Sequence, residues 1–451
     1  MSEISMQPQT GDAPKSAAGA WRIWGPAICL GILLWAAIYP FGRAFLLMQI
    51  NYTEGWNVYN AQKVAQHQLL YTSAYGWTSV NYPALSFYLA AWLGRFTSGS
   101  LFAARILSLA GLCLSALGAG LIVARATGSK FAALFSGMFL VAAFCAIGSG
   151  YVGMDDPQLL AQAFFLAGLY VYLRGGRRGW ALELTALLFV LGGNIKHNLI
   201  EFPLAVLLDL VLASPPRALR FAAAGGCMAA ASVELTSRID GSAYMACLLA
   251  PRGYSPAHIA TNLSATLLPF LLPTAAAWWT ARFCRNDPRR RVLALLLYCA
   301  LAVDAFFCGG KGVTIDGMFG SMIAIVLLSG VFWAEFPRLP LAPRLRTLPV
   351  ETVCAIFFLW LAIPMMLFHN GLTVRAFERS QATARRFAVE ASYLRTQPGA
   401  AICENLLLCY YAAKPYVYDP FNATRFIYLH RLDAEVIANR LRNQEYGAVQ
   451  L

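Results

Sequence analysis

Apolar residues are gathered into long runs, separated by short polar stretches, over most of the chain. A helix needs about 20 apolar residues to cross the hydrocarbon core of a bilayer. On that basis the sequence predicts about eleven membrane-spanning helices, near residues 24–46, 104–124, 131–150, 157–173, 180–195, 198–213, 218–236, 260–281, 292–309, 314–334 and 351–369. The predicted fold class is an all-α polytopic membrane protein.

One apolar stretch differs from these spans. The segment at residues 83–96, PALSFYLAAWLGRF, is short and begins with proline. Such a segment is typical of a helix that lies in the membrane interface. We therefore expect interfacial helices within a long first outer loop, which covers residues 50–103.

Composition agrees with a membrane protein, and the charge does not indicate nucleic acid. Of the 451 residues, 59% are hydrophobic and 13% are charged, whereas soluble domains average about 25% charged residues. The net charge is +13, but most basic residues fall in short loops between apolar runs. Basic loops of this kind indicate membrane orientation. With eleven crossings, these loops and the N-terminus share the cytoplasmic side, and the opposite loops form an outer face.

The two ends of the chain differ from the middle. Residues 1–22 are polar, and predict a disordered cytoplasmic tail before a transmembrane domain at residues 23–369. Residues 370–451 predict a small extracytoplasmic α/β domain, with strands at AAIC (400–403), PYVYD (415–419) and GAVQL (447–451). Cys403 and Cys409 share this domain. Their spacing is compatible with a disulfide and with two buried free thiols.

The stretch NYTEGWNVYNA follows the first span and holds one carboxylate, Glu54, among aromatic and amide side chains. Trp56, Asn57 and Tyr59 have spacings suited to one helical face, and Tyr82 lies further along the same loop. Rings that stack on sugars and amides that bind hydroxyl groups are typical of carbohydrate sites. We expect these residues to bind a sugar, although an isolated acid in a long loop is more often only solvated.

Two adjacent acids, Asp155 and Asp156, precede the fourth span and are followed by Pro157. An aspartate before a proline at a helix start caps free amide groups and complements the helix dipole. Capping accounts for one of the pair. We expect the other to face the outer cavity, where it would bind sugar hydroxyls, assist a metal or take part in proton transfer.

Two tight outer turns carry cations. GGNIKHN holds Lys196 and His197, and CGGKGVTIDG holds Lys311 and Asp316. A lysine in such a turn either snorkels to lipid headgroups or neutralises the phosphate of a lipid-linked substrate. The glycines around Lys311 resemble a small anion-binding nest. In the functional interpretation, both turns bind one anionic substrate.

The order of these motifs resembles that of the membrane glycosyltransferases of the C superfamily, which include protein O-mannosyltransferases and lipid A aminoarabinose transferases. The matching features are the acidic motif after the first span, HQLLY (67–71), NYPALSFYLAAWL (81–93), Arg-Ile-Leu-Ser (105–108) and Asp155–Asp156. The likeness covers about the first 210 residues and, more loosely, the whole topology. In one departure, Thr53–Glu54 stands where the family usually has an Asp-Glu pair.

The resemblance implies a sugar donor on a polyprenyl phosphate, and a glycan, lipid or protein acceptor, at the outer face of a bacterial inner membrane. It implies an inverting displacement with Glu54 as the general base, while Asp155 or Asp156 positions the reactants. Lys196, Lys311 or an outer arginine, Arg238 or Arg252, would stabilise the departing phosphate. Members of the superfamily differ in their need for a divalent metal, and the sequence assigns neither a cofactor nor metal ligands.

A multi-pass transporter or flippase of a lipid-linked or small polar substrate is the alternative. Its signal is a pair of acids within or near spans, Glu201 and Asp304, because intramembrane acids are costly and usually functional. However, the two halves of the chain lack internal symmetry, and the polar groups cluster at one face. Transporters built from repeats hold their sites near the midplane instead.

Overall fold

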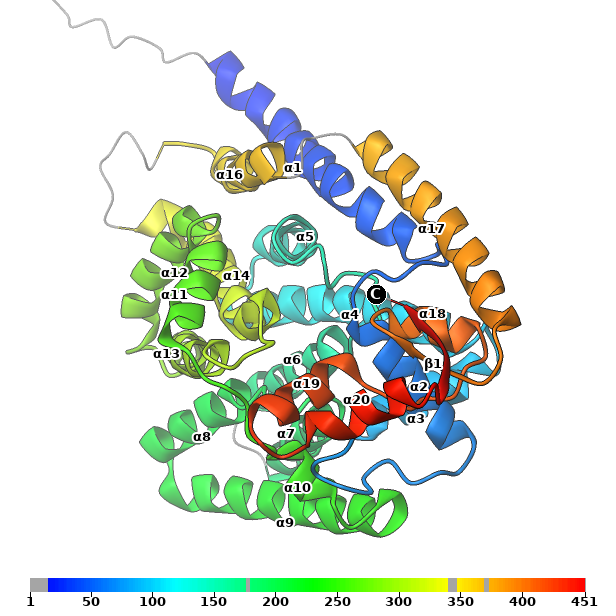
Figure 1. Cartoon of the computed structure of the whole chain (residues 1–451). Helices are drawn as coiled ribbons and strands as arrows, with labels where there is room; N and C mark the ends of the chain where they lie inside the picture. The colour runs from blue at the N-terminus through cyan, green and yellow to red at the C-terminus, as the bar shows by residue number, and fades with distance from the viewer. Residues whose placement is uncertain (1–14, 176–178, 340–346, 369–372, 451) are drawn as a thin grey trace, which may run out of the picture.

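The computed structural model describes residues 15–175, 179–339, 347–368 and 373–450, and most of them are helical (Figure 1). The bundle consists of α1 (Lys15–Arg43), α4 (Ser100–Thr127), α5 (Lys130–Ala146), α6 (Gln158–Gly175), α7 (Gly179–Ile195), α8 (Glu201–Ala213), α9 (Pro215–Asp240), α11 (Pro256–Leu267), α12 (Leu271–Cys284), α13 (Arg291–Cys308), α14 (Phe319–Glu335) and α16 (Val350–Phe368). Of the expected disordered tail, residues 1–14 lie outside the described part. The rest of that tail, from Lys15, is helical and belongs to α1.

Helices occupy each predicted span, but fewer of them have the length of a full crossing. Within the described residues, five helical stretches are long and apolar enough to cross a bilayer: Arg22–Arg43, Ser100–Thr127, Pro215–Asp240, Arg291–Cys308 and Ile315–Arg338. One bent helix pair would add a sixth. The structure therefore supports a multi-pass membrane protein, and the number of eleven crossings stays a prediction.

The span predicted at residues 260–281 is wrong as a single helix. It consists of α11 and α12, which are bent by 92°. Pro269 lies in the break between them. Proline has no N–H to donate and its ring clashes with the preceding turn, so the chain changes direction there.

Helix α14 lies at the centre of the bundle. Its side chains from Phe319 to Trp333 are all buried, and it contacts α4, α5, α12 and α13. A helix that is apolar on all sides is typical of such a central position. The helices that carry the outer loops are therefore held to one common core.

The first outer loop contains two helices, α2 (Thr53–Ala65) and α3 (Leu85–Gly94), so the helix expected within residues 83–96 is present. In α2, every residue from Glu54 to Ala61 is buried. The helix packs against α3, α4 and α18 (Leu406–Tyr411). This loop is thus a packed unit and not a solvated connection.

A buried ion pair joins α2 to α4. The Nε and Nη2 atoms of Arg105 donate to the two carboxylate oxygens of Glu54, both at 2.8 Å. Arg105 is 1% exposed and Glu54 is 0% exposed. The guanidinium also donates to the carbonyl groups of Ala44, Leu46 and Met48, which lie in the connection between α1 and α2.

The remaining lone pairs of Glu54 are also engaged. Its Oε2 accepts from the amide of Ile50 at 2.6 Å, and its Oε1 accepts from the amide of Asp155 at 3.1 Å. The carboxylate therefore connects the first outer loop, α4 and the turn before α6. Because buried charges persist only when they are paired and hydrogen-bonded, this arrangement fixes α2 against α4 and the start of α6.

The C-terminal segment contains α17 (Thr373–Thr396), β1 (Ala400–Cys403), α18, α19 (Pro420–Tyr428), α20 (Ala434–Arg442) and β2 (Tyr446–Gln450). Strands β1 and β2 pair in parallel. Two of the expected strands are present, so a small sheet does form here. Figure 1 shows α18 beside α2, in agreement with their contact.

In this segment one predicted strand is wrong, and the open question of the two cysteines is resolved. The strand predicted at residues 415–419 is wrong, because that stretch is irregular and ends at Asp419, which caps α19. Its Pro415 has no N–H for a strand ladder. Cys403 and Cys409 form a disulfide, which is one of the two arrangements that the spacing allowed.

The C-terminal segment docks onto α2 through a glycine and a tyrosine. Gly55 faces α18 so closely that a β-carbon there would overlap the backbone of Leu406 and Leu407. The hydroxyl of Tyr59 donates to the carbonyl of Lys414 at 2.8 Å, and its ring stacks on Tyr416 at 4.7 Å. Tyr59 is 3% exposed, so its role is in this docking contact, and the expectation that it binds sugar is not supported by its position.

We predict that Gly55→Ala loosens this docking. Overpacking of a well-packed contact costs about 1–3 kcal/mol, so the thermal unfolding midpoint in detergent should fall and proteases should cleave the C-terminal segment faster. Gly31→Ala is the matched control, because nothing lies within 4 Å of a β-carbon on that helical glycine. An unchanged midpoint and cleavage rate for Gly55→Ala would contradict the close contact.

We also predict that Glu54→Gln destabilises the protein. The substitution leaves the buried guanidinium of Arg105 without its counter-ion, and breaking a buried pair in this way costs about 3–5 kcal/mol. The measurement is the thermal midpoint of the purified protein. Glu183→Gln serves as the control, because its partner Arg220 is 59% exposed and exposed pairs contribute about 1 kcal/mol or less. Equal midpoints for the two variants would refute a structural role for Glu54.

Candidate active site

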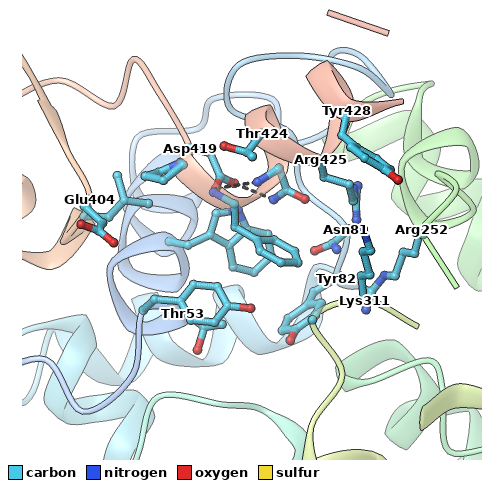
Figure 2. A pocket seen from close by; sticks show the side chains of 18 residues that line it. Thr53, Asn81, Tyr82, Arg252, Lys311, Glu404, Asp419, Thr424, Arg425 and Tyr428 are labelled. Carbon is cyan, nitrogen blue, oxygen red and sulfur yellow. Dashed lines mark hydrogen bonds between the residues drawn. The ribbon is translucent and has the colours of Figure 1, made fainter. Parts of the chain in front are cut away.

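A cavity of about 620 Å³ opens between the first outer loop, two loops of the bundle and the C-terminal segment. Figure 2 shows the side chains that surround it. Its lining consists of Tyr52, Thr53, Trp56, Asn81 and Tyr82 from the first outer loop, Arg252, Gly253, Lys311 and Gly312 from the bundle, and Glu404, Leu406, Asp419, Pro420, Phe421, Asn422, Thr424, Arg425 and Tyr428 from the C-terminal segment. The site is therefore composite, and the C-terminal segment supplies much of its wall.

Three cations converge on one side of this cavity: Arg252, Lys311 and Arg425 (Figure 2). Arg425 is 8% exposed, and none of its three guanidinium nitrogens has a hydrogen-bond partner among the described residues. Burial, and then the neighbouring charge of Arg252, lower the pKa of Arg425 to about 10. Within the described chain none of the three pairs with a carboxylate. This side of the cavity therefore carries an excess of positive charge.

The glycines around Lys311 serve packing. A β-carbon on Gly309 would overlap the ring of Tyr254, and one on Gly312, whose φ is +83°, would overlap the ring of Phe421. The amide of Lys311 donates to the carbonyl of Gly253 at 2.8 Å. The loop is thereby held against its neighbours, and the ammonium of Lys311 lies 4.2 Å from the ring centre of Tyr428. The motif presents a lysine to the cavity, and the expected backbone nest is filled by aromatic rings.

Two carboxylates line the cavity, and their surroundings differ. Asp419 is 2% exposed and caps α19, because its Oδ1 accepts from the amides of Phe421 and Asn422. Burial raises the pKa of Asp419. Glu404 is exposed, and its carboxylate makes no ion pair or hydrogen bond within the described residues. Only Glu404 is thus free to act on a substrate.

Of the residues expected to bind substrate, Trp56, Tyr82 and Lys311 line the cavity. The Nε1 atom of Trp56 donates to the carbonyl of Ser79 at 3.2 Å, and its ring packs edge-to-face on Tyr82 at 5.0 Å. These fixed rings present an aromatic wall beside the cations. Asn57 lies elsewhere, because its side-chain amide donates to the carbonyl of Asp155 at 2.5 Å.

Asp156 and Lys196 form a buried pair behind this wall. The ammonium lies 3.4 Å from the carboxylate and 3.9 Å from the ring centre of Tyr82. Burial would lower the pKa of Lys196, but Asp156, Tyr82 and Asp316 around it raise the pKa overall, so the lysine keeps its charge. Asp156 also accepts from the amide of Gln158 at 2.8 Å, as the capping interpretation required. Lys196 therefore reaches the cavity only through Tyr82.

His197 is not the cation that the sequence suggested. Burial, and then the charges of Arg252 and Lys196, lower its pKa to about 3, so it is neutral near pH 7. Its side chain lines a second cavity, an apolar groove of about 590 Å³ between α7, α8, α9 and α10 (Tyr244–Leu248). Asn194 and Ser232 also line the groove. His197 lines the groove, and the adjacent Lys196 lies against Tyr82, which lines the charged cavity.

The other predicted acids do not line the cavity. Burial, and then the Glu54 carboxylate, raise the pKa of Asp155 well above its ordinary range. Asp316 accepts from the hydroxyl of Tyr151 at 2.9 Å and from the amide of Thr314 at 3.0 Å. With Glu54 held by Arg105, these acids stabilise the floor of the site.

Sequence reasoning missed the contributions of the C-terminal segment, chiefly Glu404 and Arg425. The available signal was weak: a single arginine within PFNATRFIY, a short helix that follows a capping aspartate. Within the described residues, no group of three or more His, Cys, Asp or Glu side chains could hold a metal ion.

No family model matches the chain, and no curated protein matches it. Among solved structures, it is similar to apo ArnT from Cupriavidus metallidurans, with a TM-score of 0.61, 14% identity, and coverage of 95% of this chain and 92% of that one. The same protein bound to undecaprenyl phosphate gives a TM-score of 0.61 at 14% identity, with 94% and 91% covered. The apo oligosaccharyltransferase of Archaeoglobus fulgidus gives a TM-score of 0.50 at 10% identity, with 89% and 65% covered. The chain therefore shares the fold of ArnT and of the archaeal oligosaccharyltransferase over most of its length, which agrees with the resemblance that the order of its motifs indicated.

Proposed function

We propose that the protein transfers a sugar from a polyprenyl-phosphate donor to an acceptor hydroxyl, with inversion, at the outer face of the membrane. The observation that carries this proposal is the convergence of Arg252, Lys311 and Arg425 on one cavity, where none of them forms a salt bridge with another described residue. Such a site suits a phosphate that gains negative charge as the sugar departs. The fold agrees, since a protein with this fold has been solved with undecaprenyl phosphate bound.

The aromatic wall would bind the sugar of the donor, and the neighbouring cations would bind its phosphate. The rings of Trp56 and Tyr82 offer apolar faces against which a sugar would stack, and the amide of Asn81 would bind its hydroxyl groups. The adjacent cations would bind the phosphate. Binding in this manner orients the anomeric carbon toward the open part of the cavity, where an acceptor enters.

The apolar groove is the proposed site of the isoprenoid tail. It is lined by side chains such as Phe165, Phe189, Phe221 and Leu248, and His197 also lines it. The neutral imidazole carries no charge that an apolar chain would have to desolvate. A lipid that lies in this groove would deliver its phosphate toward Tyr82 and the three cations.

That Glu54 acts as the general base stays a prediction, and its surroundings favour a positioning role. A general base must come within hydrogen-bond distance of the proton that it accepts. Both oxygens of Glu54 accept from Arg105, and the residue is fully buried. We propose that Glu54, with Asp155 and Asp156, holds the floor of the site.

For the membrane topology we propose eleven crossings, a cytoplasmic N-terminus and an extracytoplasmic C-terminal segment, in a bacterial inner membrane. The basic loops support this orientation.

A transporter or flippase is the second candidate, since both carboxylate oxygens of the buried Glu201 lack a partner among the described residues. Its neighbour Asp304 accepts from the amide of Ser321 at 2.7 Å.

The phosphate site predicts that Arg425→Gln weakens binding of undecaprenyl phosphate. A hydrogen bond to a charged group contributes about 1.5–3 kcal/mol, which corresponds to a loss of about 10- to 100-fold in affinity. Native mass spectrometry of the detergent-purified protein gives the affinity. Arg442→Gln, on the exposed face of α20, is the control and should bind as the wild type does. Equal affinities for the two variants would remove Arg425 from the site.

Deletion of the gene distinguishes transfer from transport. We expect mass spectrometry of envelope glycans and glycolipids to show the loss of one defined sugar from the acceptor, together with accumulation of the matching polyprenyl-phosphate sugar. If the protein is instead a flippase, its deletion would leave that donor confined to the cytoplasmic leaflet. Accumulated donor that an outer-leaflet probe cannot reach would therefore favour the transporter.

A further inference from the structure

The proposed reaction needs a group that accepts the proton of the attacking hydroxyl. General bases are most often His, Asp, Glu or Lys side chains within hydrogen-bond reach of the reacting group. Among the described residues that line the cavity, the carboxylates are Glu404 and Asp419, and there is no histidine. Lys311, a lining cation, is better suited to hold the phosphate.

Asp419 is committed to its own helix. In addition to the two backbone amides that its Oδ1 accepts, its Oδ2 accepts from the side-chain amide of Asn422 at 2.5 Å. A carboxylate that is 2% exposed and fully hydrogen-bonded has no lone pair directed at a substrate. This leaves Glu404 as the free carboxylate of the lining.

The backbone around Glu404 is held firmly, although its side chain is exposed. The disulfide of Cys403 with Cys409 precedes it directly. Its amide donates to the carbonyl of Gln450 at 3.0 Å, and the next residue, Asn405, caps α18. A fixed backbone with a free carboxylate is the arrangement that a positioned base requires.

The position of Glu404 also agrees with an inverting displacement. Figure 2 shows Glu404 on one side of the cavity, and Arg252, Lys311 and Arg425 on the other. In an inverting reaction the nucleophile attacks the face of the anomeric carbon opposite the leaving group. A base on the side away from the phosphate is therefore on the side from which the acceptor attacks.

We propose that Glu404 is the general base of the transfer, a role that rests on the proposed function. The acceptor oxygen forms a bond to the anomeric carbon while the bond from that carbon to the phosphate oxygen breaks, and the electron pair of that bond stays on the phosphate. The acceptor proton passes to the Glu404 carboxylate and then to water, to which this exposed side chain has access. Arg252, Lys311 and Arg425 hold the phosphate that leaves.

This assignment accounts for Thr53. The residue lines the same cavity with a hydroxyl group, which is not a base at neutral pH, while the adjacent Glu54 is locked to Arg105. The first outer loop therefore presents no free carboxylate to the cavity in the described structure. The C-terminal segment presents one.

The test compares Glu404→Gln, Glu404→Asp and the control Glu390→Gln, an exposed glutamate on α17. Each full-length variant is expressed in cells that lack the gene. Each variant is purified from these cells and added to membrane vesicles from cells that lack the gene and carry no variant, which hold the accumulated donor. The initial rate of product formation is measured in these vesicles, and the affinity for undecaprenyl phosphate is measured on the purified protein.

We expect Glu404→Gln to lower the rate by about 100-fold or more, as loss of a general base does, while its affinity for undecaprenyl phosphate stays within about twofold of wild type. Glu404→Asp should recover part of the rate, and Glu390→Gln should match the wild type. A rate for Glu404→Gln within about threefold of wild type, or a parallel loss of lipid binding, would overturn the proposal. Wild-type protein that neither binds the lipid nor forms product would refute the proposed function itself.

Discussion

The ion pair between Glu54 and Arg105 is the interaction on which the placement of α2, α4 and the C-terminal segment depends. It joins α2 to α4, with 2.8 Å between Nε of Arg105 and Oε1 of Glu54. The same guanidinium donates to three carbonyl groups in the connection between α1 and α2. Two buried charges are stable only because each is hydrogen-bonded in all directions. Because Glu54 also accepts from the amide of Asp155, one carboxylate fixes the relative positions of α2, α4 and the start of α6.

On this base the C-terminal segment completes the site. Gly55, the residue after Glu54, leaves room for the backbone of α18, and Tyr59 binds the carbonyl of Lys414. Fixing α2 therefore also fixes the surface on which α18 docks. The docking brings Glu404 and Arg425 to opposite sides of a cavity whose floor belongs to the bundle. A segment that is remote in sequence thus acquires its place from the same helix that carries the ion pair.

The sequence predicted local features well, and features that depend on docking poorly. Long apolar runs predicted where helices form, because the apolar character of a helix is set by its own residues. Pro269 favours a break in the helix, but residues 260–281 were predicted as one span because the run around this proline is apolar. The aromatic stretch at residues 415–419 has strand-like composition, yet its Tyr416 stacks on Tyr59 instead of joining a ladder. Glu54 and Arg105 each stood out in the sequence, but their pairing needs the fold.

The uncompensated charge at Arg425 has an energetic consequence for ligand binding. A buried guanidinium without hydrogen-bond partners loses hydration that no hydrogen bond among the described residues replaces. The segment can tolerate this cost because the disulfide, the cap at Asp419 and the contact with α2 stabilise it independently. A bound phosphate would replace the lost hydration and bring Arg252, Lys311 and Arg425 into one compensated cluster. Binding of the anion should therefore stabilise the C-terminal segment itself, since a ligand that binds only the folded state shifts the folding equilibrium toward it.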